Sequence, residues 1–335
     1  MTNNKKNNLT IIAEIGSIHD GSIGNALKAI EAVAECGADV VKFQTHIVNA
    51  EMMLDAPSPP YFKDESRKDY FNRTSFSVSD WKKIVNCCTD NGILFLSSPF
   101  SIEAVDLLEE IGTSAYKIPS GEVSNLPLLE YISRKGKKVF LSSGMSNWEE
   151  LDRAVNILKN VTELEIMQCS SIYPCPLEKV GINVLKEMQE RYGTKVGLSD
   201  HTKGYSASLS AVAMGASVIE KHFTFSRKMY GSDAKYGLEP IEYRFFCNLL
   251  REGEIIRSNP IDKNNLTDYS EMKIIFEKSI VTAKKIYSNS TINLEDLAFK
   301  KPGDGIPAFE YKKIIGKKIK RDVNADYKLS WDDIK

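Results

Sequence analysis

Two of the chain's four histidines stand at matching points of consecutive segments. His201 follows the run "KVGLSD", His222 follows "SVIEK", and a stretch rich in Ala and Ser with helical spacing lies between them. Two imidazoles at the ends of neighbouring strands can share one divalent cation and leave its other positions to water or substrate. A lone histidine at a strand end is more often structural, but the pair favours a metal site. His19 and His46 are left open between the wall of a site and a structural role.

Cationic and hydroxyl side chains follow other β-rich runs. A lysine in a strand usually extends its ammonium group into solvent. Lys42 and Lys117, however, lie just before polar strand ends, which favours a functional role for both. Two lysines with small hydroxyl residues and glycines beside them can hold a phosphate or a carboxylate by charge-assisted hydrogen bonds. The other polar residues at the ends of these runs include Gln44, Ser98, Ser120, Ser171, Tyr173, Ser199, Glu220 and Lys221.

Three carboxylates complete this set of residues. Glu14, Glu122 and Asp233 could move protons or hold sugar hydroxyls. The two prolines of "IYPCP" predict a fixed turn that aims Tyr173 into the same site.

The elements that position these residues alternate regularly along the chain. Eight β-rich runs, from "TIIAEIG" to "SVIEKHFT", alternate with segments of helical period, and several of those segments end in Gly. Eight strand–helix units in about 255 residues predict an α/β fold of the (β/α)8 TIM-barrel type, with the active site at the carboxyl ends of the strands. An open doubly wound sheet would alternate in the same way, but the regular eight units and the lack of a G-x-G-x-x-G motif favour a closed barrel.

The pattern changes after the last helix of the barrel. Residues 1–258 form the predicted catalytic barrel, 259–275 are polar and predict a linker, and 276–335 predict a small β-rich domain. Residues 46–76 make a long connection after the second strand, which is typical of a functional lid or an oligomer contact. Its apolar and aromatic side chains over residues 61–76 favour a deoxy sugar as ligand.

Composition narrows the class of protein. The net charge of −1 gives no electrostatic reason to expect nucleic acid or a membrane surface as a partner. The start has no long apolar segment, no run approaches a membrane span, and the six cysteines are scattered without a C-x-x-C pair. We expect a cytoplasmic protein with reduced thiols.

In these residues and the motifs that contain them, the chain resembles the sialic acid (N-acetylneuraminate) synthase family, whose members condense phosphoenolpyruvate with an N-acetylated aldose. The matching motifs run through the whole chain, and the tail around "LAFKKPGDGIPAFEY" resembles the family's antifreeze-like (SAF) domain. The motifs are "AEIGSIHDGS", "GADVVKFQTHIV", "FLSSPFS", "YKIPSGEVSNLPLL", "KKVFLSSGM", "QCSSIYPCP", "VGLSDHT", "GASVIEKHFT" and "GSDAKYGLEP".

The resemblance implies a role for each matching position. Metal ligands for Mn²⁺ or Mg²⁺ fall on His201 and His222, and catalytic-site carboxylates fall on Glu14 and Glu122. Contacts to phosphoenolpyruvate fall on Lys42, Ser98, Lys117, Ser120, Ser171 and Ser199. Contacts to the acceptor sugar, N-acetylmannosamine or a 2,4-diacetamido-trideoxyhexose, fall on Gln44, Tyr173 and Asp233.

Three positions depart from the family's pattern. Ser98 stands where the family usually has Thr, and Ser171 stands where it has Asn or a residue with a hydroxyl group. Lys301 replaces an Arg that, in the family, reaches the acceptor pocket from the tail of the partner subunit. The family therefore implies a homodimer with exchanged tails, and the loss of the planar guanidinium fork bears on the identity of the acceptor.

Two other functions fit parts of the sequence. A Schiff-base aldolase on the same barrel would use Lys42 or Lys117 as nucleophile. A carbohydrate- or ice-binding protein would suit an antifreeze-like tail, but it would not need two histidines and two lysines at one end of a barrel.

Overall fold

The computed structural model describes residues 9–53, 55–57 and 65–335. The chain divides into two units, the first ending at Asn259 and the second spanning Pro260–Lys335. None of the helices in the described part of the chain has the length and apolarity needed to cross a lipid bilayer.

The first unit is a parallel barrel, as the alternation of runs predicts. Its strands are β1 Thr10–Gly16, β2 Val40–Thr45, β3 Leu94–Pro99, β4 Ala115–Ile118, β5 Lys138–Ser142, β6 Leu164–Cys169, β7 Lys195–Asp200 and β8 Val218–His222. They pair in the order β3-β2-β1-β8-β7-β6-β5-β4, and β3 also contacts β4, which closes the ring. The prediction of a (β/α)8 barrel is confirmed.

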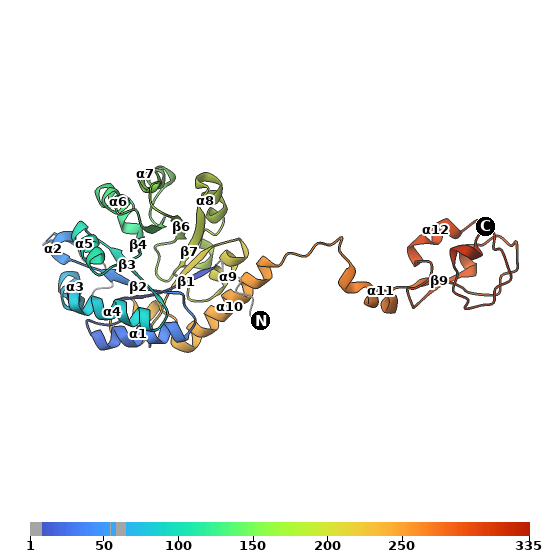
Figure 1. Ribbon diagram of the computed structural model, residues 1–335, viewed down its shortest axis with the longest axis horizontal. Helices are drawn as coiled ribbons and strands as arrows, with labels where there is room; N and C mark the ends of the chain where they lie inside the picture. Colours follow the sequence, from blue (N-terminus) through green and yellow to red (C-terminus); the bar gives the residue numbers. More distant parts are fainter. Residues whose placement is uncertain (1–8, 54, 58–64) are drawn as a thin grey trace. The chain divides into compact units, whose positions relative to one another are not determined.

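Helices surround the strands (Figure 1). They are α1 Ile23–Glu35, α2 Val48–Glu51, α3 Arg67–Thr74, α4 Val78–Asp90, α5 Ile102–Glu110, α6 Leu126–Ser133, α7 Trp148–Leu158, α8 Val184–Tyr192, α9 Ser206–Ala213 and α10 Pro240–Ser258. Several begin at a residue whose side chain accepts a hydrogen bond from the first turn, as Ser22 does for α1 and Asn147 does in the capping box of α7. The apolar faces of these helices pack on the outside of the strands and form the main core.

Inside the barrel, the side chains change from apolar to charged along each strand. Near the amino ends the interior is filled by Ile12, Val40, Leu96, Ala115, Phe140, Met167 and Val218. Because every second residue of a strand points inward, the next inward positions on four of these strands are Glu14, Lys42, Lys117 and Glu220. An apolar plug thus closes one end, and the site lies at the other.

The long connection after β2 contains α2 and α3, which the sequence did not predict. Residues 54 and 58–64, including the first part of the segment expected to favour a deoxy sugar, lie outside the described residues.

The second unit has its own small core, and it begins with helical turns. The stretch expected as a linker, 259–275, contains the 3-10 turn η4 Thr267–Tyr269 and most of α11 Ser270–Phe276. Antiparallel strands β9 Ser279–Thr282 and β10 Leu297–Lys300 follow, with α12 Tyr311–Ile314 later in the chain. The core residues are Ile280, Ile286, Ile292, Leu297, Ile306, Ile314, Ile319, Val323 and Leu329.

Candidate active site

A cavity of about 380 Å³ lies at the carboxyl ends of the strands. All the residues predicted for the site line it, except Glu122 and Lys301. They arrive from seven different strands or the loops after them, which is the usual construction of an active site in this type of barrel. His46, which the sequence left open, also lines the cavity, whereas His19 lines a neighbouring cavity of about 260 Å³.

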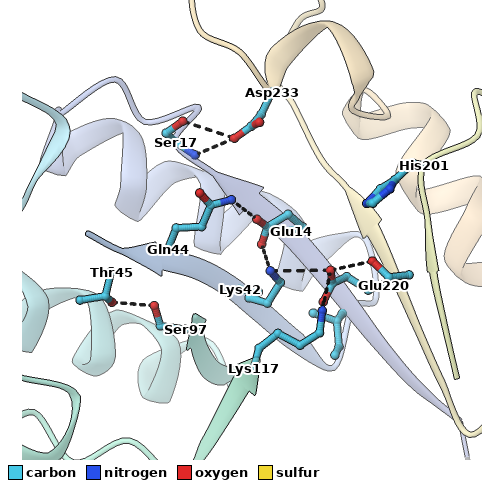
Figure 2. A network of polar contacts seen from close by, with 12 residues as sticks. Glu14, Ser17, Lys42, Gln44, Thr45, Ser97, Lys117, His201, Glu220 and Asp233 are labelled. Carbon is cyan, nitrogen blue, oxygen red and sulfur yellow. Dashed lines mark hydrogen bonds and ion pairs between the residues drawn. The ribbon is translucent and has the colours of Figure 1, made fainter. Parts of the chain in front are cut away.

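Two lysines and two carboxylates form a buried network at the floor of this cavity (Figure 2). Lys42 Nζ lies 2.9 Å from Glu14 Oε2 and 3.6 Å from Glu220 Oε1. Lys117 Nζ donates to both oxygens of Glu220, at 3.0 and 3.2 Å. The Ser199 hydroxyl donates to Glu220 Oε1 at 3.0 Å. Two positive charges therefore lie side by side, and two negative charges balance them.

Burial and neighbouring charges act in opposition on these groups. Burial alone would raise the pKa of Glu220, but the charges of Lys117 and Lys42 outweigh it and lower that pKa to about 2. Burial alone would lower the pKa of Lys42, but Glu14 and Glu220 outweigh it and raise that pKa. Burial and the charge of Lys42 lower the pKa of Lys117, with Glu220 opposing them.

Glu220 is a site residue to which the sequence assigned no role. The signal that could have found it is the alternation of β8: if His222 points into the barrel, so must the residue two positions before it. Its contacts could not be foreseen, because Lys42 and Lys117 lie on strands distant in sequence. The structure also adds Phe71, Phe100 and Tyr236 to the lining of the cavity.

Several serine hydroxyl groups line the same cavity as the two lysines. A Cβ placed on Gly144 would lie 2.4 Å from Ser120 Oγ and 2.5 Å from Ser171 Oγ, so the missing side chain leaves room for both hydroxyls. Ser98 Oγ is buried and has no hydrogen-bond partner in the described part of the chain. A buried donor without a partner is costly, and a bound anion would satisfy it.

The two predicted metal ligands lie next to each other, with their ring centroids 5.7 Å apart. His201 Nδ1 lies 2.8 Å from the Ser170 carbonyl, to which it donates, so Nε2 keeps its lone pair; that atom lies 2.9 Å from the Tyr173 hydroxyl. Among the residues that the structure describes, His222 Nδ1 is buried and has no hydrogen-bond partner. Burial, aided by His201 and Lys42, lowers the pKa of this imidazole.

These histidines fit a divalent cation with open positions. Neutral imidazole nitrogens are the form that binds metal. The buried Nδ1 of His222, which no described residue hydrogen-bonds, would be satisfied by such a ligand role. Within the described residues, no group of three or more His, Cys, Asp or Glu side chains is arranged to hold a metal. For such a cation the pair would supply two ligands, and water or substrate would have to supply the rest.

The wall opposite the histidines is built on Gln44. Its amide donates to Glu14 Oε1 at 2.7 Å, and its oxygen faces His46 Nε2 at 3.2 Å. His46 is stacked between the rings of Phe71 and Phe100, and its Nδ1 lies 2.9 Å from Glu51 Oε1 on α2. The loop after β2 is thereby connected to the floor of the site.

Asp233 closes another side of the cavity. Its Oδ2 accepts from the backbone N–H and the hydroxyl of Ser17, at 3.2 and 3.3 Å (Figure 2). Gly16 has a φ of +47°, and a Cβ there would lie 2.2 Å from Asp233 Oδ2. Glycine is therefore required for both the turn and the approach of the carboxylate.

Two predicted residues are not among those that line this cavity. Glu122 ends the turn η1 (Ser120–Glu122), and its carboxylate accepts from Asn125 Nδ2 at 2.8 Å; burial and the nearby Glu51 raise its pKa. Lys301 belongs to the second unit, where its Nζ lies 4.8 Å from the centre of the Phe276 ring.

Comparison with known proteins gives a consistent result for both units. A model of the NeuB family matches residues 29–261, and a model of the SAF domain matches residues 277–335. The N,N'-diacetyllegionaminic acid synthase of Campylobacter jejuni subsp. jejuni serotype O:2 is 36% identical over 325 residues, covering 94% of this chain and 97% of that protein.

More distant relatives carry related names. The N-acetylneuraminate-9-phosphate synthase of Homo sapiens is 31% identical over 324 residues, covering 94% of this chain and 90% of that protein. The crystal structure of the N-acetylneuraminic acid synthetase of Leptospira borgpetersenii serovar Hardjo-bovis in complex with citrate is 28% identical in sequence. It covers 79% of this chain and 90% of that chain, with a TM-score of 0.69.

Proposed function

Because the chain belongs to the NeuB family, and is a nonulosonic acid synthase, we propose that its acceptor is the open-chain form of a 2,4-diacetamido-trideoxyhexose. The observation that carries this choice is the 36% identity, over nearly the whole length of both chains, to a diacetyllegionaminic acid synthase. Phe71 and Phe100 beside Gln44 give the cavity apolar surface that suits a deoxy sugar. Neither the lysine aldolase nor the carbohydrate-binding protein is favoured by the relatives.

The acceptor is tested by the release of phosphate from phosphoenolpyruvate in the presence of different sugars. The panel holds 2,4-diacetamido-trideoxyhexoses, N-acetylmannosamine and N-acetylmannosamine 6-phosphate. We expect kcat/KM to be at least tenfold higher for a diacetamido sugar. A preference for N-acetylmannosamine or its phosphate would reject the proposed acceptor but leave the reaction class intact.

The charged floor of the cavity suits the binding of phosphoenolpyruvate. Lys42 and Lys117 would hold its phosphate and carboxylate, with the hydroxyls of Ser98, Ser120 and Ser171 as further donors. Held in this way, carbon 3 of phosphoenolpyruvate can be placed against the aldehyde carbon of the acceptor. Formation of the carbon–carbon bond leaves carbon 2 electron-poor, water adds there, and phosphate leaves with cleavage of the C–O bond. Glu14, buried beside Gln44, would move a proton in these steps.

We also propose that His201 and His222 hold Mn²⁺ or Mg²⁺. A divalent cation there would supply Lewis-acid stabilisation of the charge that develops on the aldehyde oxygen. EDTA should abolish phosphate release, and Mn²⁺ should restore it. Full activity of a His201→Ala, His222→Ala double variant would rule out this assignment.

The working enzyme is further proposed to be a homodimer in which the second unit of one chain, through Lys301, completes the acceptor pocket of the other. The support is the match of residues 277–335 to the SAF domain, together with the positive charge of Lys301 at the position where the resemblance implies an Arg. We place the reaction in the cytoplasm, since all six cysteines are free thiols, as expected in a reducing compartment.

A further inference from the structure

An ion pair lies buried outside the cavity, next to the two histidines. Lys221 Nζ lies 2.9 Å from Asp200 Oδ2, and the two side chains are 1% and 0% exposed. Asp200 and Lys221 are paired in the register of β7 and β8, one residue before His201 and His222 respectively. Because side chains alternate along a strand, the pair points to the helical side of the barrel while the histidines point to the cavity.

The pair also holds the backbone on both sides of His201. Lys221 Nζ donates to the Thr202 carbonyl at 2.7 Å, and Thr202 N–H donates to Asp200 Oδ1 at 2.8 Å. The Ser208 hydroxyl, on α9, donates to Asp200 Oδ2 at 2.6 Å. The residue before His222 is therefore connected to the residues before and after His201.

A buried ion pair is a poor way to gain stability, because desolvation of the charges offsets most of their attraction. Its geometry, however, is strict, and here it crosses between the two strands that carry the histidines. We propose that Asp200 and Lys221 are positioning residues that fix the spacing and orientation of His201 and His222 for a divalent cation. This inference rests on the metal site proposed above.

The test uses the full chain, freed of metal, and follows Mn²⁺ binding by the electron paramagnetic resonance signal of the free ion. The variant Asp200→Asn, Lys221→Met removes both charges together, which avoids leaving one of them buried and unpaired. Outer groups that orient metal ligands typically change metal affinity by about 10- to 100-fold, so the Kd should rise at least tenfold. Circular dichroism should remain that of the wild type.

A matched control lies at the opposite end of the barrel. Lys138 and Glu165 form a partly buried pair near the amino ends of β5 and β6. The variant Lys138→Met, Glu165→Gln removes that pair and should leave the Kd for Mn²⁺ unchanged. A His201→Ala, His222→Ala variant should bind no Mn²⁺, which shows that the titrated site is the histidine pair.

The outcomes separate the two proposals. A wild-type protein that binds no Mn²⁺ would overturn the metal site, and the positioning role with it. Mn²⁺ binding with the same Kd in wild type and in Asp200→Asn, Lys221→Met would overturn the positioning role alone. If that variant fails to fold, Ser208→Ala, which removes one hydrogen bond to Asp200, replaces it. A Kd raised severalfold by Ser208→Ala supports the proposal, and an unchanged Kd contradicts it.

Discussion

Lys117 and Lys42 are each fully buried, and a lysine in such a place needs compensation for its lost hydration. Glu14 supplies it for Lys42, and Glu220 supplies it for Lys117. A phosphate or carboxylate that enters the site would take over part of this role, so binding exchanges one set of charge-assisted contacts for another.

Replacement of Lys117 by Met tests this arrangement. The change keeps most of the side chain's bulk and removes one donor to the substrate anion. We expect the KM for phosphoenolpyruvate to rise, or kcat to fall, by at least tenfold, which corresponds to about 1.4 kcal/mol. Steady-state kinetics with phosphoenolpyruvate as the varied substrate measure it. Lys186→Met, on the exposed face of α8, is the control. If the two variants show the same kinetics, Lys117 does not contact phosphoenolpyruvate.

Most site residues could be predicted because strand ends of a barrel converge, whatever the distance in sequence. The two lysines, Gln44, His201 and His222 were found in this way, and all of them line the cavity. The ion pairs of Glu220 could not be predicted, because they join strands β2, β4 and β8, whose contacts inside the barrel are not encoded locally. Glu122 was predicted from its place after β4, but the turn η1 brings its carboxylate to Asn125.

At the scale of elements, the eight strands were predictable because each is buried on both faces and therefore forms a short apolar, β-rich run between segments of helical period. The short helices α2 and α3 were not, since four and eight residues give little room for a helical period. In the loop after β5, a single residue, Gly144, determines how much room the hydroxyls of Ser120 and Ser171 have.

Gly144→Ala should impair phosphoenolpyruvate binding without harm to the fold. The new Cβ would lie within 2.5 Å of the hydroxyls of Ser120 and Ser171, and both can rotate away, which removes them as donors. We expect the KM for phosphoenolpyruvate to rise about tenfold, with an unchanged melting temperature. Gly204→Ala, where a Cβ meets nothing within 4 Å, should behave as wild type. Unchanged kinetics in Gly144→Ala would show that these hydroxyls do not contact the substrate.

The turn between β1 and α1 should make the barrel sensitive to acid. Burial lowers the pKa of His19 to about 4, against the opposing charges of Asp20 and Asp233, and its Nδ1 accepts a hydrogen bond from Gly21 N–H. The unfolded chain binds this proton near pH 6.5, so stability is complete above that pH and falls as the pH drops towards 4. The loss amounts to about 3 kcal/mol.

Urea unfolding of wild type and His19→Gln between pH 7 and pH 4.5 measures this effect. The variant lacks the titrating group. The difference between its free energy of unfolding and that of the wild type should therefore become smaller as the pH falls. A difference between the two proteins that stays constant with pH would contradict the assignment to His19.

At the scale of the whole molecule, the proposed exchange of second units predicts complementation. A Lys301→Ala chain keeps an intact barrel, and a His222→Ala chain keeps an intact tail. After random re-assortment, half of the dimers are mixed, and each mixed dimer has one intact site. Activity should therefore recover to about a quarter of the wild-type value per site.

The control is the same mixture without subunit exchange, which should stay inactive. Mass spectrometry of the assembled subunits verifies that exchange has taken place. Absence of recovery after verified exchange would show that each tail serves its own barrel.

The ion pairs between the lysines and the carboxylates at the barrel floor should affect how strongly small anions inhibit the enzyme. Inorganic phosphate must compete with Glu220 and Glu14, which are already in place and lose no translational freedom when they bind the lysines. Phosphoenolpyruvate carries two anionic groups on one skeleton, so it can displace these contacts at two points for a single loss of freedom. If phosphoenolpyruvate binds as proposed above, Glu220 and Glu14 would weaken the binding of an anion that contacts only one lysine. A Glu220→Gln enzyme should then be inhibited by lower phosphate concentrations than the wild type. An enzyme that releases phosphate in every turnover gains from this weaker binding, because its own product is then a weak competitor.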